Sequence, residues 1–218
     1  MEGEHTRVIG GRYRLGDELG RGGMGVVYQA EQRSLLREVA IKQLKHLNPE
    51  LEEHLVREAR LMGRLSHPNI PPVYALHRGE SGYAEVVMKK IEGETLLDWC
   101  GDEPLQGVKL QEGLKHLIQV CYALEFAHNQ GIMHRDIKAE NIMLGRFHEV
   151  YLMDWGVALD LNQLSTAPHG VVGTPRHLAP EMLSGDPAHI TPRTDVYLLG
   201  ALLHQLLTGH PRHNAPTL

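Results

Sequence analysis

Short apolar runs separated by glycine turns and polar stretches predict a small β-sheet between Tyr13 and Met88. The stretch from Tyr13 to Lys45 follows the pattern strand, glycine turn, strand, turn, strand, with β-branched runs at Val26–Tyr28 and Glu38–Ile41. Two further strands are predicted at Val73–Leu76 and Tyr83–Met88. One helix separates the first three strands from the last two. The pattern therefore predicts a small lobe of five strands and one helix.

The single helix of this lobe has a clear start signal. Asn48 is suited to the N-cap, Pro49 to the first helical position, and the acidic residues that follow complement the helix dipole. Apolar residues then recur at spacings of three and four: Leu51, Leu55, Ala59 and Met62. Glu58 therefore lies between two turns that face the core, and the helix is expected to end before His67-Pro68-Asn69.

After Gly93 the pattern becomes mainly helical. Residues with a helical period run up to a stop at Gly131: Leu114, Leu117, Ile118, Cys121, Leu124 and His128. Short strands are predicted around Ile142–Leu144 and Val150–Met153, and an irregular polar stretch continues to Pro180. A last apolar helix is predicted from Asp195 to Leu207. These patterns together predict an α+β protein.

Composition excludes several classes of protein. With 27 acidic and 22 basic residues the chain carries a formal charge of −5, and no basic run is longer than Lys89-Lys90, so nucleic acid is not an expected partner. The longest apolar stretch is well short of the roughly 20 residues of a membrane span. The two cysteines lack disulfide or zinc spacing, and the acidic N-terminus is unlike a signal peptide. A cytoplasmic protein with no membrane contact from this segment is expected.

Gly20-Arg21-Gly22-Gly23-Met24-Gly25 fits a GxGxxG pattern that two unrelated folds use. In a dinucleotide-binding turn the glycines lead from a strand into a helix. Here they lead into Val26-Val27-Tyr28, which is predicted to be a strand, so a hairpin over phosphates fits better. In isolation, a plain glycine hairpin turn is the better explanation of the motif.

Further motifs follow in a fixed order. Lys42 ends the strand Val39-Ala40-Ile41-Lys42, and Glu58 follows on the helix, where it can pair with the ammonium. Three more motifs complete the order: His134-Arg135-Asp136-Ile137-Lys138-Ala139-Glu140-Asn141, Asp154-Trp155-Gly156 and Ala179-Pro180-Glu181. Chance composition does not produce five separate signals in one order.

These motifs resemble those of the eukaryotic-like (Hanks-type) bacterial serine/threonine protein kinases. The resemblance runs from about Arg12 to about Pro211, and Asp154-Trp155-Gly156 is similar to a bacterial subgroup with Trp in place of Phe. It implies a two-lobe kinase fold. Residues 1–11 would be an N-terminal tail, 12–90 the ATP-binding lobe, with its antiparallel sheet and one helix, and 91–218 a mainly helical catalytic lobe.

The resemblance also implies the roles of residues in the second lobe. Asp136 would accept the proton of a substrate hydroxyl, and Lys138 would neutralise the γ-phosphate. Asn141 and Asp154 would hold Mg²⁺, or Mn²⁺, because both offer oxygen ligands. Thr174 resembles the threonine that bonds Asp136 and Lys138 and helps to admit Ser or Thr substrates.

In the first lobe the resemblance implies a nucleotide site for ATP. Gly20, Gly22 and Gly25 would cover the phosphates, while Lys42, oriented by Glu58, would hold the α- and β-phosphates. Apolar positions around the adenine ring, the gatekeeper and the hinge would be Val27, Ala40, Met143, Met88 and Lys89 to Ile91. As sequence, the apolar members of this set are indistinguishable from ordinary core.

The segment between Asp154 and Glu181 resembles an activation loop. Ser165 and Thr166 are its candidate autophosphorylation sites, and Arg135 is the residue that usually receives such a phosphate. Both are equally well explained as loop-forming polar residues. Asp195 either caps the last helix or, as the resemblance implies, braces the backbone at His134.

Several positions depart from the family's usual pattern. Trp155, Ala139 and His177 replace the usual Phe, Pro and aromatic residue. The chain stops soon after the Asp195 helix, so a truncated catalytic lobe is expected. The arginine that usually pairs with Glu181 has no candidate except Arg212, which is a poor one.

The sequence supports one main function and one rival. The main interpretation is a kinase that transfers the γ-phosphoryl group of Mg-ATP to Ser or Thr of protein substrates, its own chain included. The rival is a nucleotide-binding pseudokinase-like scaffold or an inactive kinase fragment, against which the complete set of charged residues argues. Fifteen histidines invite a metal interpretation, but no HExxH or comparable ligand set is present.

Overall fold

The computed structural model of the 218-residue chain describes residues 8–9, 11–22, 25–46, 48–79, 81–166 and 169–213. The chain forms two compact units. The first unit comprises Met1–Ser66 and Pro71–Ile91, and the second comprises His67–Ile70 and Glu92–Leu218. The short segment His67–Ile70 thus belongs to the second unit although it lies within the sequence of the first. Each unit is described by itself.

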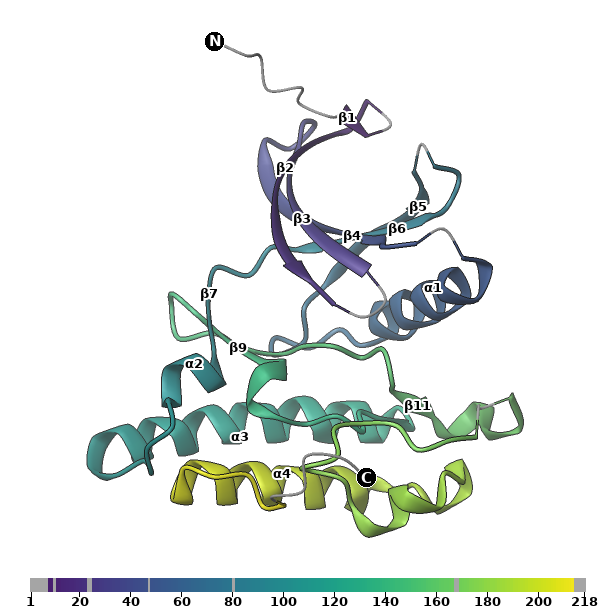
Figure 1. Cartoon of the computed structure of the whole chain (residues 1–218). Coiled ribbons are helices and arrows are strands. Elements are labelled where there is room, and N and C mark those ends of the chain that lie inside the picture. Colours follow the sequence, from purple (N-terminus) through teal and green to yellow (C-terminus); the bar gives the residue numbers. More distant parts are fainter. Residues whose placement is uncertain are drawn as a thin grey trace. The chain divides into compact units, whose positions relative to one another are not determined.

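The first unit is built on a six-stranded antiparallel sheet (Figure 1). Its strands are β1 (Val8–Ile9), β2 (Tyr13–Arg21), β3 (Gly25–Gln32), β4 (Arg37–Leu44), β5 (Val73–Arg78) and β6 (Ala84–Lys89), in the order β1-β2-β3-β4-β6-β5. The five expected strands are all present. The sheet also has the two-residue strand β1, which lies in the stretch 1–11 that the sequence suggests is a tail.

Helix α1 (Pro49–Arg64) packs its apolar side against this sheet. Its start is as predicted: Asn48 is the N-cap, and its side-chain oxygen accepts a hydrogen bond from the Glu50 N–H at 2.8 Å. The core between helix and sheet contains Ala40, Leu55, Ala59, Ala84, Val86 and Met88. Burial of this apolar surface holds α1 in register with β4 and β6.

The second unit is mainly helical, which confirms the expected α+β class. Its helices are α2 (Leu96–Cys100), α3 (Gly107–Asn129) and α4 (Pro192–Thr208), with α3 and α4 side by side (Figure 1). Strands β7 (Gly93–Thr95), β9 (Ile142–Gly145) and β10 (Val150–Leu152) form one small antiparallel sheet, and β8 (Ile132–Met133) pairs with β11 (Leu159–Asp160). Short 3-10 turns connect them: η1 (Ala139–Asn141), η2 (Leu161–Thr166), η3 (Pro180–Ser184) and η4 (Pro187–His189).

Two sequence expectations about these helices need correction. Helix α4 begins at Pro192 rather than Asp195, because Thr191 caps it through a capping box with Thr194. On α3 the buried positions are Gly113, Leu117, Val120, Ala123, Leu124 and Ala127. Of the predicted apolar face, Leu114, Ile118 and Cys121 are exposed. A long helix that is apolar on much of its circumference does not reveal from its period alone which side faces the core.

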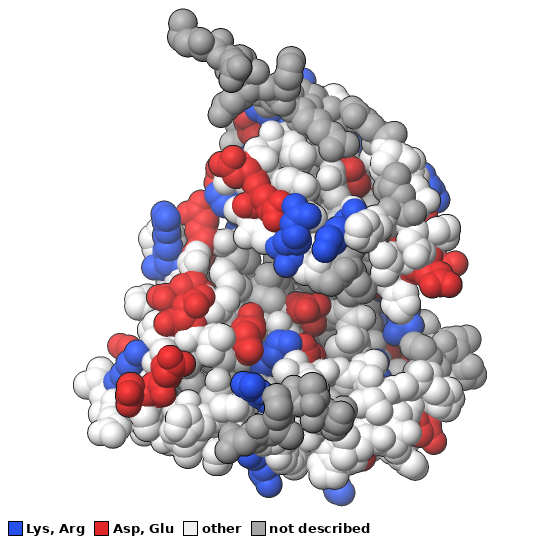
Figure 2. All heavy atoms as spheres, viewed as in Figure 1, with Lys and Arg blue, Asp and Glu red and all other residues white. Residues whose placement is uncertain are grey.

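Acidic and basic side chains are interspersed on the face shown in Figure 2. Over the described part of the chain, none of the helices combines the length and the hydrophobicity that crossing a bilayer requires.

The cap of α1 gives a first testable prediction. Replacing Asn48 with Ala removes the acceptor of the Glu50 N–H and should lower the free energy of unfolding by about 1 kcal/mol, measured by urea denaturation. Asn129→Ala, at an exposed position in the last turn of α3, is the control and should change it by much less. Equal effects of the two substitutions would show that the cap is not a specific stabiliser.

Candidate active site

The glycine-rich turn of the first unit joins two strands. Strand β2 ends at Arg21, β3 begins at Gly25, and the Gly22 N–H donates to the Gly25 carbonyl at 2.9 Å. Of the two kinds of turn that carry this motif, the chain therefore has the β-hairpin and not the turn from a strand into a helix. Gly23 and Met24 lie outside the described residues. A Cβ at Gly25 would lie 2.5 Å from the Gln43 carbonyl oxygen, whereas at Gly20 it would meet nothing within 4 Å. Gly25 is therefore required by packing, while the space at Gly20 is open to a ligand.

Lys42 and Glu58 form a buried ion pair within the first unit. The Lys42 Nζ lies 2.8 Å and 2.7 Å from the two carboxylate oxygens of Glu58. The Glu58 side chain is only 6% exposed and that of Lys42 16%. A strand and a helix each supply one partner, so the position of the ammonium depends on the position of α1. Removing one partner of an ion pair this well buried destabilises the fold, because the remaining charge is left buried without a partner.

The predicted adenine-binding residues of the first unit are grouped on one side of the sheet. Ala40 and Met88 are directly opposite each other on β4 and β6, and Val27 packs against the same cluster. The Lys89 N–H donates to the Pro72 carbonyl at 3.1 Å and is therefore committed within the protein. Any hydrogen bond from this stretch to a base must come from another backbone group between Lys89 and Ile91. Met143, the remaining member, belongs to β9 of the second unit.

Asp136 is the centre of a dense polar cluster in the second unit. Its Oδ1 accepts the Thr174 hydroxyl at 2.7 Å, and its Oδ2 lies 2.8 Å from the Lys138 Nζ and accepts the Asn141 Nδ2–H at 2.8 Å. Lys138 also donates to the Thr174 oxygen at 2.7 Å. The loop between β8 and η1 thus brings together residues that the sequence separates by up to 38 positions.

The charge state of Asp136 follows from these contacts. Burial by itself raises the pKa of the carboxyl, since it disfavours the charged form. The hydrogen bonds from Lys138 and Thr174, the Lys138 charge and the Asn141 hydrogen bond outweigh burial, and the pKa of Asp136 lies below its ordinary value. Asp136 is therefore an ionised acceptor at neutral pH.

Thr174 reaches Asp136 because its neighbour is glycine. Gly173 has φ +104°, and a Cβ there would lie 3.0 Å from the Arg135 carbonyl oxygen. A side chain at this position would push the segment away from the loop that carries Asp136. The motif Gly173-Thr174 is thus one structural unit, with the glycine allowing the approach and the hydroxyl making the contact.

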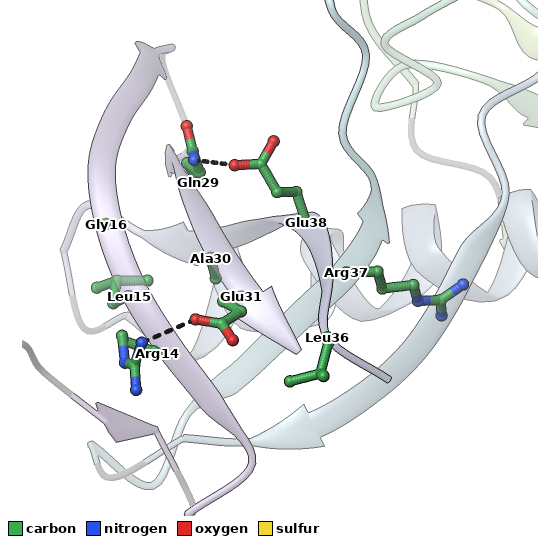
Figure 3. Close-up of a pocket in the computed structure, with 9 residues that line it drawn as sticks. All are labelled: Arg14, Leu15, Gly16, Gln29, Ala30, Glu31, Leu36, Arg37 and Glu38. Carbon is green, nitrogen blue, oxygen red and sulfur yellow. Dashed lines mark hydrogen bonds and ion pairs between the residues drawn. The ribbon is translucent and has the colours of Figure 1, made fainter. Parts of the chain in front are cut away.

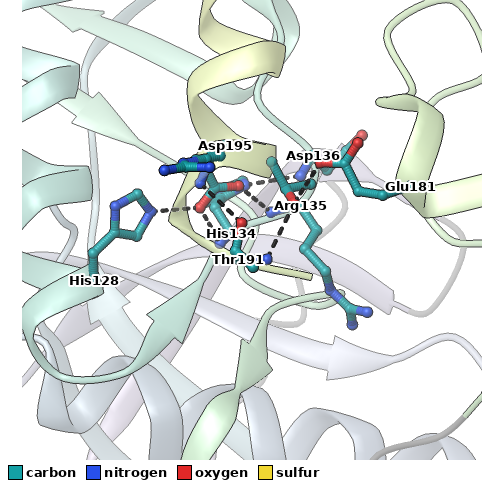
Figure 4. Close-up of polar contacts among 9 residues, drawn as sticks. His128, His134, Arg135, Asp136, Glu181, Thr191 and Asp195 are labelled. Atoms are coloured by element: carbon teal, nitrogen blue, oxygen red, sulfur yellow. Dashed lines mark hydrogen bonds and ion pairs between the residues drawn. The ribbon is translucent and has the colours of Figure 1, made fainter. Parts of the chain in front are cut away.

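Asp195 supports the loop that carries Asp136 (Figure 4). Its carboxylate is completely buried and accepts the backbone N–H groups of His134 at 2.9 Å and Arg135 at 2.8 Å, while the His128 Nε2 lies 2.8 Å from Oδ2. Arg135 has φ +69°, a conformation that a residue with a side chain rarely adopts. Of the two roles open to Asp195 in the sequence, the structure shows the brace, since Thr191 is the cap.

Asn141 and Asp154 offer oxygens to a cation. The Asn141 amide nitrogen is used twice, on the Asp136 carbonyl and carboxylate, and among the described residues its Oδ1 accepts no hydrogen bond. Asp154 is exposed, and within the described part of the chain it accepts only a long hydrogen bond, 3.4 Å, from the Gly156 N–H. The Met153 N–H donates to the Asn141 carbonyl at 2.7 Å, so the two segments are adjacent. Carboxylate and amide oxygens without strong protein partners suit a hard divalent cation.

The proposed regulatory residues are only partly described. Ser165 and Thr166 end η2, but their side chains lie outside the described residues. Arg135 is buried, and its Nε donates to the Val157 carbonyl at 2.7 Å. The Arg135 side chain is thus already bound to Val157, directly after Asp154-Trp155-Gly156, and a phosphate that binds Arg135 would meet it in this position.

Sequence reasoning missed several supporting contacts. Glu181 accepts the buried Thr194 hydroxyl at 2.7 Å, whereas Arg212 lies over the ring of Tyr197. Asn69 donates to the Val150 carbonyl and to Gln119, and its own carbonyl accepts the Leu152 N–H. The His-Pro-Asn helix break and the Thr-x-x-Thr spacing at α4 are the only sequence signals that pointed to them.

The sheet of the first unit also has a pocket that is separate from the predicted site residues (Figure 3). It is lined by residues of β2, β3 and β4, and the side chains in it already pair with each other or with neighbours: Arg14 with Glu31, Gln29 with Glu38 and Arg37 with Gln32. None of the predicted site residues lines it, and we assign it no function.

The cluster around Asp136 makes a prediction about pH. Thr174→Val removes one of the hydrogen bonds that lower the pKa of Asp136, so this pKa should rise toward its ordinary value, as measured by carboxyl ¹³C NMR. Because the folded-state pKa is the lower one, the stabilisation from Asp136 is complete above the unfolded-state pKa and is lost as the pH falls through the folded-state pKa. The variant should lose it at higher pH than the wild type does.

Thr208→Val, at an exposed threonine at the end of α4, is the matched control and should leave the Asp136 titration where it is. An unchanged titration in Thr174→Val as well would show that the hydroxyl contributes nothing to the charge of Asp136.

Comparison with known proteins gives a consistent result. A family model described as a protein kinase domain matches residues 13–217. The chain is 33% identical to the serine/threonine-protein kinase PknD of Protochlamydia amoebophila, over 90% of this chain and 23% of the relative. It is 38% identical to a probable serine/threonine-protein kinase of Streptomyces coelicolor (95% and 32%) and 37% identical to the serine/threonine-protein kinase PknB of Mycobacterium leprae (92% and 33%). The chain thus spans about a quarter to a third of these curated relatives.

Proposed function

Because this chain belongs to the protein kinase family, we propose that it transfers the γ-phosphoryl group of ATP to serine or threonine hydroxyls of proteins, including its own. The observation that carries the proposal is the cluster in which Lys138, Thr174 and Asn141 converge on Asp136. Phosphoryl transfer requires positioning and charge more than covalent chemistry, and this cluster supplies both.

In the second unit, Asp136 orients the substrate hydroxyl and accepts its proton. Its lowered pKa keeps it ionised at neutral pH, so the acceptor is present in every turnover. Lys138 neutralises charge on the γ-phosphate, and Thr174 holds both side chains and favours a Ser or Thr substrate. Asn141 and Asp154 would hold Mg²⁺, or Mn²⁺, which when bound neutralises charge on the phosphates.

In the first unit, Lys42 binds the α- and β-phosphates and Glu58 keeps its ammonium in place. Gly20, Gly22 and Gly25 cover the phosphates; the open space at Gly20 leaves room for them, whereas Gly25 allows β3 to pack against Gln43. The adenine ring is bound by Val27, Ala40, Met88 and the backbone from Lys89 to Ile91.

Two finer proposals accompany this function. From the motif Asp154-Trp155-Gly156 we propose that the chain belongs to a bacterial subgroup of the family with Trp in place of Phe, and we propose that the protein acts in the cytoplasm. Cys100 and Cys121 are both free thiols, which suits a reducing compartment.

The direct test is phosphate incorporation from γ-labelled ATP with Mg²⁺, on the chain alone and with a generic basic protein. Asp136→Asn should lower incorporation by roughly 10²–10⁴-fold, the range for loss of a general base, while ATP still raises the melting temperature. Asp102→Asn, at an exposed acidic residue, is the control and should label as the wild type does.

Equal labelling by wild type and Asp136→Asn would overturn the role of Asp136. A wild-type chain that takes up no label but is stabilised by ATP would favour the rival interpretation of a nucleotide-binding scaffold.

The Lys42–Glu58 pair gives a separate prediction. Lys42→Met removes the ammonium and leaves the Glu58 carboxylate buried without a partner, and it should lower the phosphorylation rate by about 10²–10³-fold. Lys45→Met, an exposed lysine on the same segment, is the matched control and should retain the wild-type rate. Normal turnover of Lys42→Met would exclude Lys42 as the phosphate-binding lysine.

A further inference from the structure

Helix α1 lies beside strands β5 and β6 of the first unit (Figure 1). Strand β6 lies between β4 and β5, and its pairing with β4 ends at Lys42↔Val86. Strand β6 itself begins two residues earlier, at Ala84, which is only 5% exposed. N–H groups alternate in direction along a strand, and that of Lys89 donates to Pro72 on the β5 side, so that of Ala84 points to the β4 side. There the ladder has ended, and a buried N–H needs another acceptor.

Glu52 of α1 supplies that acceptor. Its Oε1 accepts the Ala84 N–H at 2.9 Å, and the same oxygen lies 3.2 Å from Nη1 of Arg78. Arg78 is the last residue of β5 and also donates to the Gly82 carbonyl within the β5–β6 hairpin. The Glu52 side chain is 18% exposed, whereas that of Arg78 is 73% exposed. The bond to the backbone is therefore the sheltered contact, and the exposed ion pair adds little to it.

A second polar contact between α1 and the sheet follows six residues later. Glu58 binds Lys42 of β4 there, about 9 Å further along the helix axis. Between the two, Leu55 and Ala59 pack in the core that α1 shares with the sheet. Apolar packing is non-directional, so it keeps α1 on the sheet without fixing its rotation. Two hydrogen-bonded points on different strands fix the rotation as well, so the direction of Glu58 depends on the contact at Glu52.

We propose that Glu52 is a positioning residue for the Lys42–Glu58 pair: by accepting the Ala84 N–H it fixes the first turns of α1 on the sheet, so that Glu58 reaches the ammonium. An acidic residue that only complemented the helix dipole would need no contact with β6. The consequence for phosphate binding rests on the proposed function, in which Lys42 binds the α- and β-phosphates.

Three variants separate the hydrogen bond from the charge. Glu52→Gln keeps a side-chain oxygen for the Ala84 N–H but loses the charge, whereas Glu52→Leu loses both and remains a good helix former. Glu53→Leu, at the exposed neighbouring position, is the matched control.

The contact is tested first without nucleotide or metal, by hydrogen exchange followed with ¹H–¹⁵N NMR. In Glu52→Leu the Ala84 N–H and the ammonium protons of Lys42 should exchange about three- to tenfold faster than in the wild type, because the bond to Ala84 is lost and the Lys42–Glu58 pair opens more often. Glu52→Gln and Glu53→Leu should exchange as the wild type does.

The consequence is tested by a double-mutant cycle on the phosphorylation rate. Glu52→Leu alone should lower the rate about three- to tenfold and raise the KM for ATP, with the KM for the protein substrate unchanged, and Glu52→Gln should restore most of the rate. In a Glu58→Gln background the pair is already broken, so Glu52→Leu should change the rate by less than about twofold. A residue that only stabilised the fold would have the same effect in both backgrounds.

Unchanged exchange at Ala84 or Lys42 in Glu52→Leu would overturn the proposal. So would an equal loss of rate in both backgrounds, or equal defects in Glu52→Gln and Glu52→Leu, which would assign the effect to the charge alone. If Glu52→Leu does not fold, Glu52→Asp takes its place in both experiments, because the shorter carboxylate reaches the Ala84 N–H only if α1 moves. If the wild type transfers no phosphate, the proposed function is wrong, and the exchange rates still decide whether Glu52 holds the Lys42–Glu58 pair.

Discussion

The candidate active site of the second unit depends on one buried carboxylate. Asp195 is fully buried and would be destabilising there without partners, but the backbone N–H groups of His134 and Arg135 and the ring of His128 satisfy both of its oxygens. These hydrogen bonds also stabilise the positive φ of Arg135, a strained backbone conformation. Asp136 is the next residue, so the backbone that carries it is held in place by Asp195 of α4, a helix distant in sequence.

Further polar contacts connect to this support. Lys138, Thr174 and Asn141 share the Asp136 carboxylate. The His134 ring contacts the Met153 carbonyl, and Trp155 packs on the His134 ring. The residues proposed to position the hydroxyl, the phosphate and the cation therefore rest on one connected set of hydrogen bonds. Such a set is pre-organised, so little reorganisation is needed when substrate charge develops.

In the first unit, a buried ion pair holds the proposed phosphate-binding group in position. Lys42 carries the positive charge, and the buried Glu58 fixes it through two short contacts from a neighbouring helix. Because α1 contributes one half of this pair, any displacement of the helix would leave two buried charges uncompensated. Family membership and this pair together explain why a helix with a strong cap and an apolar face carries one buried glutamate.

Local signals in the sequence determined the elements and the chemical groups. Asn48-Pro49 predicted the start of α1, and β-branched runs between turns predicted the strands, because caps and turns act over a few residues. The ordered motifs and their resemblance to a known family pointed to Lys42, Glu58, Asp136, Asn141 and Asp154. Only the tertiary structure decided which side of α3 is buried, that Thr191 and not Asp195 caps α4, and that Thr194 is the partner of Glu181. Each of these depends on contacts between segments far apart in the chain, and periodicity does not encode which distant group will satisfy a buried polar atom.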